Sequence, residues 1–150
     1  MSSPTVMIVD DVAFMRRTIR VILENKGFSV VTEVDDPRKA LHMYQACKPD
    51  LVILDILMPR MNGIEVAKQI MAYDKEAAIL TCTSASQEKN IREILEAGVK
   101  DVIVKPFDVE EFCGRCVSLV RSKFGEETPE EDEDSKASPV YDFLTKKSHE

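Results

Sequence analysis

Carboxylates stand at two places in this sequence where a short apolar run ends. Asp10 and Asp11 directly follow one such run, and Asp55 directly follows another. Because a carboxylate is costly to bury without a partner, its position at the end of an apolar run needs an explanation. Two later apolar runs are followed by other groups that can do chemistry, the hydroxyl of Thr83 and the ammonium of Lys105.

If the folded chain brings these side chains together, the three carboxylates would repel one another unless a cation neutralised them. Charged oxygen ligands suit Mg²⁺, which keeps several water ligands and so leaves room for a phosphate oxygen. Thr83 could donate a hydrogen bond to a phosphoryl group, and Lys105 could pair with its charge. With an aspartate as nucleophile, this set of groups predicts a site that forms an acyl phosphate.

The rest of the chain alternates between strand-like and helix-like segments that could position these groups. Apolar runs rich in β-branched residues predict five strands, at Val6–Val9, Phe28–Val34, Leu51–Leu54, Ala78–Cys82 and Val102–Val104. Helical spacing and end signals predict helices from Phe14 until a stop at Gly27, from Asp36-Pro37, after Asn62-Gly63, over Glu88–Ala97 and over Asp108–Phe124. This alternation indicates an α/β fold with five helices and a single doubly wound, five-stranded parallel sheet. The flavodoxin-like strand order 2-1-3-4-5 is the commonest for such a sheet.

In an open parallel sheet, ligands bind beside the carboxyl ends of the strands, where the strand order switches. The predicted topology therefore brings all five polar side chains to one edge of the sheet. Each has a simpler explanation when taken alone. Asp11 and Thr83 could cap helices, Asp55 could shape a turn, and Lys105 could be a solvated loop residue. Since these explanations would all have to hold at once, we favour a common site.

Composition and charge suggest one domain followed by a charged tail. The chain is 44% hydrophobic with a net charge of −7, and most of the excess negative charge lies beyond residue 124. We therefore predict a domain over residues 1–124 and an acidic, disordered tail over residues 125–150. The apolar strip VYDFL at residues 140–144 could instead dock a partner or fold back onto the domain.

Several classes of protein are disfavoured by the same composition. No basic face is visible, so direct binding to nucleic acid by this chain is not expected. No run approaches the roughly 18 apolar residues of a membrane helix. The start of the sequence lacks the pattern of a signal peptide, which favours the cytoplasm.

The segment CGRC at residues 113–116 resembles a redox or zinc half-site. Redox cysteines usually sit at a helix N-terminus, whereas this pair lies more than a turn inside a predicted helix. A zinc site would need two further ligands, and the only histidines are His42 and His149. We therefore expect a packing role for this pair, as for Cys47 and Cys82.

In combination, these motifs resemble a response-regulator receiver domain of bacterial two-component systems, the CheY-like family. The resemblance covers residues 4–123. It rests on IVDD at 8–11, LDILMP at 54–59, NG at 62–63, Thr83, AG at 97–98 and KPF at 105–107. It implies a phosphorylation-dependent signalling switch that is not an enzyme, apart from catalysing its own phosphorylation and slow dephosphorylation.

The resemblance also implies roles for individual residues. Asp55 would be the phosphoacceptor and Asp11 the principal Mg²⁺ ligand, while Asp10 would hold the metal largely through a water molecule. The backbone carbonyl of Leu57 would be a further ligand. Thr83 would be the switch hydroxyl. Lys105 would pair with the phosphoryl group, and its bond to Pro106 would be cis.

Two positions depart from the family pattern. Val102 stands where an aromatic residue often precedes the lysine, and Ser84 follows Thr83 where a smaller residue is usual. The positions that flank the attacking water in the family are Leu57 and Ala85, neither of which can bind water through its side chain. Slow self-dephosphorylation is therefore expected.

By resemblance, a sensor histidine kinase or phosphotransfer protein would be the phosphodonor. Phosphorylation would change a protein-binding face formed by helix 4, strand 5 and helix 5, and a downstream protein would be the target. A Mg²⁺-dependent phosphatase with an aspartyl nucleophile is one alternative, but it needs an acid two residues after the nucleophile, where this chain has Val12 and Leu57. A scaffold of the same fold that is never phosphorylated is another.

Overall fold

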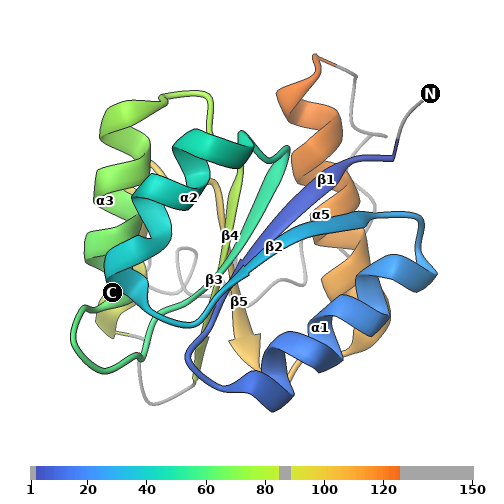
Figure 1. The fold of residues 1–150 in the computed structure, drawn as a ribbon, viewed down its shortest axis with the longest axis horizontal. Helices are drawn as coiled ribbons and strands as arrows, with labels where there is room; N and C mark the ends of the chain where they lie inside the picture. The colour runs from blue at the N-terminus through green and yellow to red at the C-terminus, as the bar shows by residue number, and fades with distance from the viewer. Residues whose placement is uncertain (1–2, 85–88, 126–150) are drawn as a thin grey trace, which may run out of the picture.

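Strands and helices alternate along the whole of the computed structural model, which describes residues 3–84 and 89–125 (Figure 1). The strands are β1 Thr5–Val9, β2 Ser29–Val34, β3 Leu51–Asp55, β4 Ile79–Ser84 and β5 Asp101–Lys105. The helices are α1 Ala13–Asn25, α2 Ala40–Cys47, α3 Gly63–Tyr73, α4 Ile91–Glu96 and α5 Val109–Lys123, and a 3₁₀ turn η1 spans Pro37–Lys39.

The strands form one parallel sheet in the order β2-β1-β3-β4-β5, which confirms the predicted topology. In the centre of the sheet, Val9 of β1 is paired in register with Leu54 of β3. On the other side of β3, Asp55 is paired with Cys82 of β4. Because every strand runs in the same direction, the residues that follow Val9 and Leu54 leave the sheet at the same edge.

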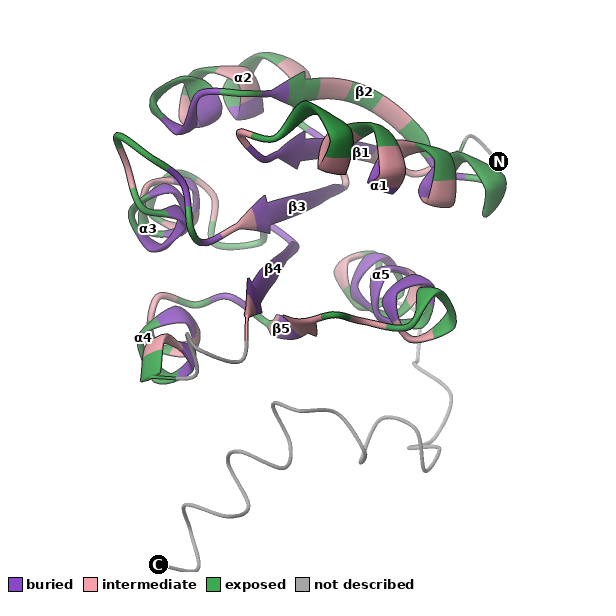
Figure 2. Ribbon diagram, turned by 90° about the horizontal axis from the view of Figure 1, so that it is seen from below, coloured by how far each residue is buried: buried purple, intermediate pink, exposed green. Residues whose placement is uncertain are grey.

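Helices cover both faces of the sheet and create two apolar cores. Helices α1 and α5 lie on one face, and α2, α3 and α4 lie on the other (Figure 2). Figure 2 shows β3 and β4 buried over almost their whole length between these layers. A central parallel strand covered on both faces reads as a continuous apolar run, which explains the composition of Leu51–Leu54.

Two helix ends follow the predicted signals. Gly27 (φ +90°) and Gly98 (φ +99°) adopt left-handed backbone after α1 and α4, a conformation that glycine takes without steric cost. The carboxylate of Asp36 accepts a hydrogen bond from the backbone N–H of Arg38 (3.0 Å) and caps η1, so the predicted second helix begins with a 3₁₀ turn before α2.

Some predicted boundaries differ from the structure or cannot be compared with it. Strands β4 and β5 extend through Ser84 and Lys105, where Ser84 pairs in register with Lys105. Thr83 and Lys105 are therefore strand residues, not loop residues. Helix α4 begins at Ile91, and the predicted helix start at Glu88 lies outside the described residues. So does the predicted tail, beyond Gly125.

Three of the four cysteines are packing residues, as predicted, whereas Cys47 is only partly buried and is not a member of either apolar core. Cys82, Cys113 and Cys116 are buried, all four thiols are free, and burial raises the pKa of the Cys82 thiol to about 12. Burial also raises the pKa of Cys113 and Cys116.

Within residues 3–84 and 89–125, no helix has both the length and the apolar character needed to cross a membrane.

Candidate functional site

Three carboxylates converge at the edge of the sheet where β1 and β3 end. Asp10 and Asp11 follow β1, and Asp55 is the last residue of β3. One oxygen atom from each of the three side chains lies within 4.8 Å of the others. The strand register explains this convergence, because the residue after Val9 lies opposite the residue after Leu54.

Asp10 is the most deeply buried of the three, with 2% of its surface exposed. Its backbone N–H donates to the carbonyl of Val34 (3.1 Å), which continues the pairing of β1 with β2. One of its carboxylate oxygens, Oδ1, accepts a hydrogen bond from the backbone N–H of Val12 (2.9 Å). Helix α1 has Val12 at its N-cap without a side-chain cap, so the alternative role of Asp11 as the helix cap is not observed.

Asp55 pairs with Lys105, which extends from the last position of β5 across β4. The distance from Lys105 Nζ to Asp55 Oδ1 is 3.4 Å, and the two side chains are 28% and 12% exposed. Lys105 is therefore not a freely solvated loop residue. The peptide bond between Lys105 and Pro106 is cis, as expected from the family resemblance.

Thr83 lies on β4, one residue beyond Cys82, the register partner of Asp55. The residue is 2% exposed, and its hydroxyl donates a long hydrogen bond of 3.5 Å to the carbonyl of Ser84. The structure thus places Thr83 at the same edge of the sheet as the carboxylates and Lys105. Leu57, in the loop after β3, has a side chain that points outward and is 67% exposed.

The loop after β3 returns closely to the strand that it leaves. Asn62 caps α3 by accepting a hydrogen bond from the N–H of Ile64 (2.7 Å), and the N–H of Gly63 donates to the carbonyl of Ile56 (2.9 Å). A Cβ atom on Gly63 would lie 2.7 Å from the Cα of Ile56 and still closer to the carbonyl oxygen of Asp55. The sequence predicted a helix after Asn62-Gly63 but not this close contact with the backbone of Asp55.

Burial and mutual repulsion make the carboxylates hard to ionise together. Burial raises the pKa of Asp10 above its ordinary value, the Val12 N–H opposes this rise, and the charge of Asp55 adds to it. Burial likewise raises the pKa of Asp55, whereas Lys105 lowers it and Asp11 raises it. The site therefore has excess negative charge that a cation would offset.

The metal-free protein should be destabilised near neutral pH by the ionised Asp10. A carboxyl whose pKa is raised on folding binds its proton more tightly in the folded state, so stability falls as pH rises through that range. We expect Asp10→Asn to raise the Tm at pH 7 without Mg²⁺ by a few degrees. The gain should vanish below the ordinary pKa of 3.8, where the wild-type carboxyl is protonated in both states. Thermal melts at several pH values would measure it.

Asp35→Asn is the control for the change of charge, since Asp35 is exposed in the loop after β2. It should leave the Tm nearly unchanged at pH 7. A Tm of Asp10→Asn below that of the wild type at pH 7, or a gain that persists at pH 3, would contradict the electrostatic explanation.

The donor set fits Mg²⁺. It consists only of charged oxygen ligands, from Asp10, Asp11 and Asp55, and it is the one cluster of potential metal-ligating side chains found in residues 3–84 and 89–125. Asp11 and Asp55 are more exposed than Asp10, so water can reach the cluster. Hard oxygen ligands with room for several waters are the environment that Mg²⁺ prefers in proteins.

Comparisons with known proteins agree with this geometry. Residues 6–116 match the family model of the response regulator receiver domain. The chemotaxis protein CheY of Thermotoga maritima is 45% identical over 102 residues, which cover 68% of this chain and 85% of the relative.

Solved structures with the same fold include a two-component response regulator of the LuxR family from Aurantimonas, with a TM-score of 0.83 and 26% identity. That match covers 99% of this chain and 100% of the other. CheY in the CheX–CheY–BeF₃–Mg²⁺ complex from Borrelia burgdorferi has a TM-score of 0.74 and 32% identity, covering 79% of this chain and 90% of that one.

Proposed function

This chain belongs to the response regulator receiver domain family, and from that membership we propose that it is a switch that accepts a phosphoryl group on Asp55. Proteins of this family act in signalling and are not enzymes in the usual sense. The observation that carries the proposal is the cluster of three carboxylates whose oxygens lie within 4.8 Å, with Lys105 Nζ 3.4 Å from Asp55. This arrangement supplies a nucleophile, a site for a cation and a positive charge at one point.

We propose that Asp10, Asp11, Asp55 and the backbone carbonyl of Leu57 hold Mg²⁺. When bound, the metal would supply positive charge to the transferring phosphoryl group. A carboxylate oxygen of Asp55 attacks the phosphorus of a phosphohistidine and forms a new O–P bond. The P–N bond of the donor breaks at the same time, and its electron pair stays on the imidazole nitrogen.

The phosphoryl group adds a charge of about −2 to the site, which Lys105 and the Thr83 hydroxyl would bind. Both residues lie on strands that lead away from the site, so their movement would alter the face formed by α4, β5 and α5. Val102 is buried on β5 and has no ring, so this switch would not use a rotating aromatic side chain there. The change is a shift between two packings, driven by contacts that only the phosphorylated state makes.

The partners follow from this chemistry. We propose a sensor histidine kinase or phosphotransfer protein as the phosphodonor, a second protein as the target, and the cytoplasm as the compartment, by likeness to the CheY relatives. The Borrelia relative, in complex with CheX, BeF₃ and Mg²⁺, illustrates the kind of ligands involved.

We place the receiver domain at residues 1–124, since α5 ends at Lys123, and propose that residues 125–150 form a separate tail.

A phosphatase activity is disfavoured by the residues near the carboxylates. Leu57 and Val12 occupy the positions two residues after Asp55 and Asp10, and neither carries a proton that it could give to a leaving group. Steady release of phosphate from a phosphomonoester would overturn this conclusion.

The function is tested by incubating the protein with acetyl phosphate and measuring phosphate incorporation by intact-protein mass spectrometry. We expect one phosphoryl group per chain in the presence of Mg²⁺ and none after treatment with EDTA. Incorporation that does not depend on a divalent cation would contradict a role for the carboxylate cluster. Failure to incorporate phosphate or to bind beryllofluoride would instead favour a scaffold that is never phosphorylated.

The phosphoryl group is expected to persist for minutes or longer after the donor is removed. Leu57 lies next to the site with an exposed apolar side chain, which cannot orient an attacking water molecule. Ala85, the second flanking position, lies outside the described residues. Leu57→Asn should shorten the lifetime several-fold, as measured by the decay of the phosphorylated mass with Mg²⁺ present. A wild-type lifetime of seconds would refute this prediction.

A further inference from the structure

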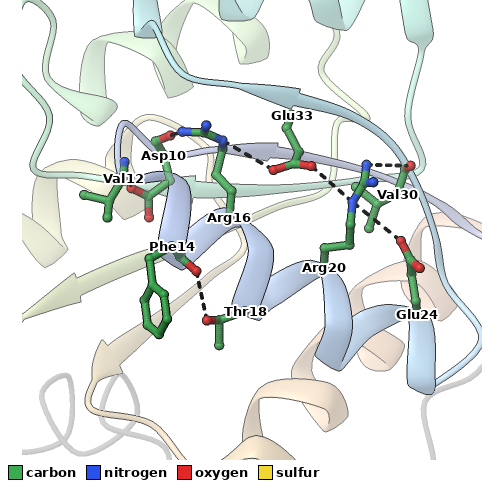
Figure 3. Close-up of polar contacts among 9 residues, drawn as sticks. All are labelled: Asp10, Val12, Phe14, Arg16, Thr18, Arg20, Glu24, Val30 and Glu33. Atoms are coloured by element: carbon green, nitrogen blue, oxygen red, sulfur yellow. Dashed lines mark hydrogen bonds and ion pairs between the residues drawn. The ribbon is translucent and has the colours of Figure 1, made fainter.

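Arg16 joins three elements behind the carboxylate cluster. It lies at the end of the first turn of α1, and its guanidinium Nη1 donates a hydrogen bond of 2.7 Å to the backbone carbonyl of Asp10 (Figure 3). Its Nε lies 3.4 Å from a carboxylate oxygen of Glu33 on β2, and the Arg16 side chain is only 16% exposed. The guanidinium therefore links α1 to the end of β1 and to the edge strand β2.

The hydrogen bond from Arg16 constrains the peptide that carries two of the three carboxylates. The carbonyl of Asp10 belongs to the peptide unit between Asp10 and Asp11, and that unit is planar. The preceding N–H is fixed by Val34, and the Asp10 side chain is fixed by the N–H of Val12. The bond from Arg16 thus fixes the plane from which the backbone of Asp11 departs.

Arg16 acts on geometry more than on the charge of the site. Its ion-pair partner is Glu33, which belongs to the edge strand β2 and not to the strands that carry the site carboxylates. The structure gives Arg16 a backbone acceptor at the site and an anion outside it.

Arg20 provides a natural comparison, because it shares most of these features but not the contact with Asp10. It lies one turn further along α1, and its Nε is 3.1 Å from the other carboxylate oxygen of Glu33. It also pairs with Glu24 (3.5 Å) and donates to the carbonyl of Val30 (3.5 Å) (Figure 3). Both arginines therefore join α1 to β2, but only Arg16 extends to the site.

We propose that Arg16 is a positioning residue for the cation site, held by Glu33 and acting through the Asp10 carbonyl to orient Asp10 and Asp11. This inference rests on the proposed binding of Mg²⁺. Groups that hydrogen-bond to metal ligands without contacting the metal typically contribute a factor of 10 to 100 in metal affinity. Loss of Arg16 should therefore weaken Mg²⁺ binding without removing a ligand.

The test compares Arg16→Met with Arg20→Met, which remove the same charge from the same helix and the same Glu33 partner. Mg²⁺ binding is measured by isothermal titration calorimetry well below the Tm of each variant. We expect roughly tenfold weaker binding for Arg16→Met and a change of less than about twofold for Arg20→Met. In phosphorylation by acetyl phosphate, the Mg²⁺ concentration for half-maximal rate should rise for Arg16→Met, while the rate at saturating Mg²⁺ stays close to that of the wild type.

Each result decides between explanations. Equal Mg²⁺ affinity in Arg16→Met and the wild type would overturn the inference, as would equal losses in both variants, which would indicate a general structural role. If Arg16→Met does not fold, Arg16→Gln replaces it, because the glutamine side chain ends near the position of the Arg16 Nε and does not extend to the Asp10 carbonyl that Nη1 contacts. An affinity equal to that of the wild type would again overturn the inference. If the wild type itself binds no Mg²⁺, the proposed function fails instead.

Discussion

Asp55→Asn is expected to reduce phosphoryl incorporation from acetyl phosphate to background. The substitution keeps the size of the side chain but removes the anionic oxygen that attacks phosphorus and the charge that pairs with Lys105. Loss of a nucleophile costs enzymes roughly 10⁶-fold in rate. Asp55 is also the carboxylate that pairs directly with the ammonium of Lys105, at 3.4 Å, and this pairing opposes the rise that burial causes in its pKa. It is therefore the best-placed nucleophile of the cluster.

Two further variants show whether the loss is specific to the nucleophile. Asp11→Asn retains Asp55 but removes a proposed metal ligand, so it should be phosphorylated only at higher Mg²⁺ concentrations. Asp35→Asn changes an exposed aspartate outside the cluster and should be phosphorylated like the wild type. Mass spectrometry of the intact protein and of its peptides measures all three. Mg²⁺-dependent incorporation that persists in Asp55→Asn would show that the phosphoacceptor is another residue.

The effect on signalling follows from the same substitution. A partner captured by the phosphorylated wild type in a pull-down should be lost with Asp55→Asn, whether or not residues 125–150 are present. A partner that depends on residues 125–150 but not on Asp55 would bind the tail instead, and its capture would separate the functions of the two segments.

Much of the fold could be predicted because local patterns and topology agree. The continuous apolar run Leu51–Leu54 indicates a strand covered on both faces, and that is its place in the sheet. Glycines at positions 27 and 98 mark helix ends that require left-handed backbone. Strand ends were harder to predict, because Thr83 and Lys105 are polar. Their place in β4 and β5 depends on pairing between strands, which periodicity along one segment cannot show.

The site itself was predictable to the extent that it depends on strand ends. A parallel sheet places the carboxyl ends of all its strands at one edge, so Asp10, Asp55 and Lys105 were expected at that edge. The structure brings them together there. Arg16 was not predicted, because an arginine at helical spacing has the same pattern as a solvated helix face. Its acceptor is a backbone carbonyl, which carries no sequence signal. Contacts between side chains and backbone of other elements can be found only in three dimensions.

Gly63→Ala is expected to damage both stability and phosphorylation, because the space for a methyl group is already filled by backbone. A Cβ atom at this position would overlap the carbonyl oxygen of Asp55 and lie 2.7 Å from the Cα of Ile56. These are backbone atoms of the last residue of β3 and of the residue that follows it, so they cannot rotate away as a side chain would. The start of α3 and the end of β3 must therefore move apart, and Asp55 moves with them.

We expect Gly63→Ala to lower the free energy of unfolding by about 1–3 kcal/mol, the usual cost of forcing an extra group into a packed site. Displacement of a reacting group by about 1 Å can cost roughly 10²-fold in rate, so phosphorylation should slow at least tenfold. Urea denaturation and the rate of incorporation from acetyl phosphate measure the two effects.

Gly114→Ala is the matched control, since Gly114 lies inside α5 and a Cβ atom there would have no neighbour within 4 Å. Alanine favours helix over glycine by about 1 kcal/mol, so this variant should be more stable than the wild type and phosphorylated at the same rate. The same chemical change thus has opposite expected effects on stability at the two positions. If Gly63→Ala were also more stable than the wild type, or were phosphorylated at the wild-type rate, the position of the Asp55 backbone would not require a residue without a Cβ atom at position 63.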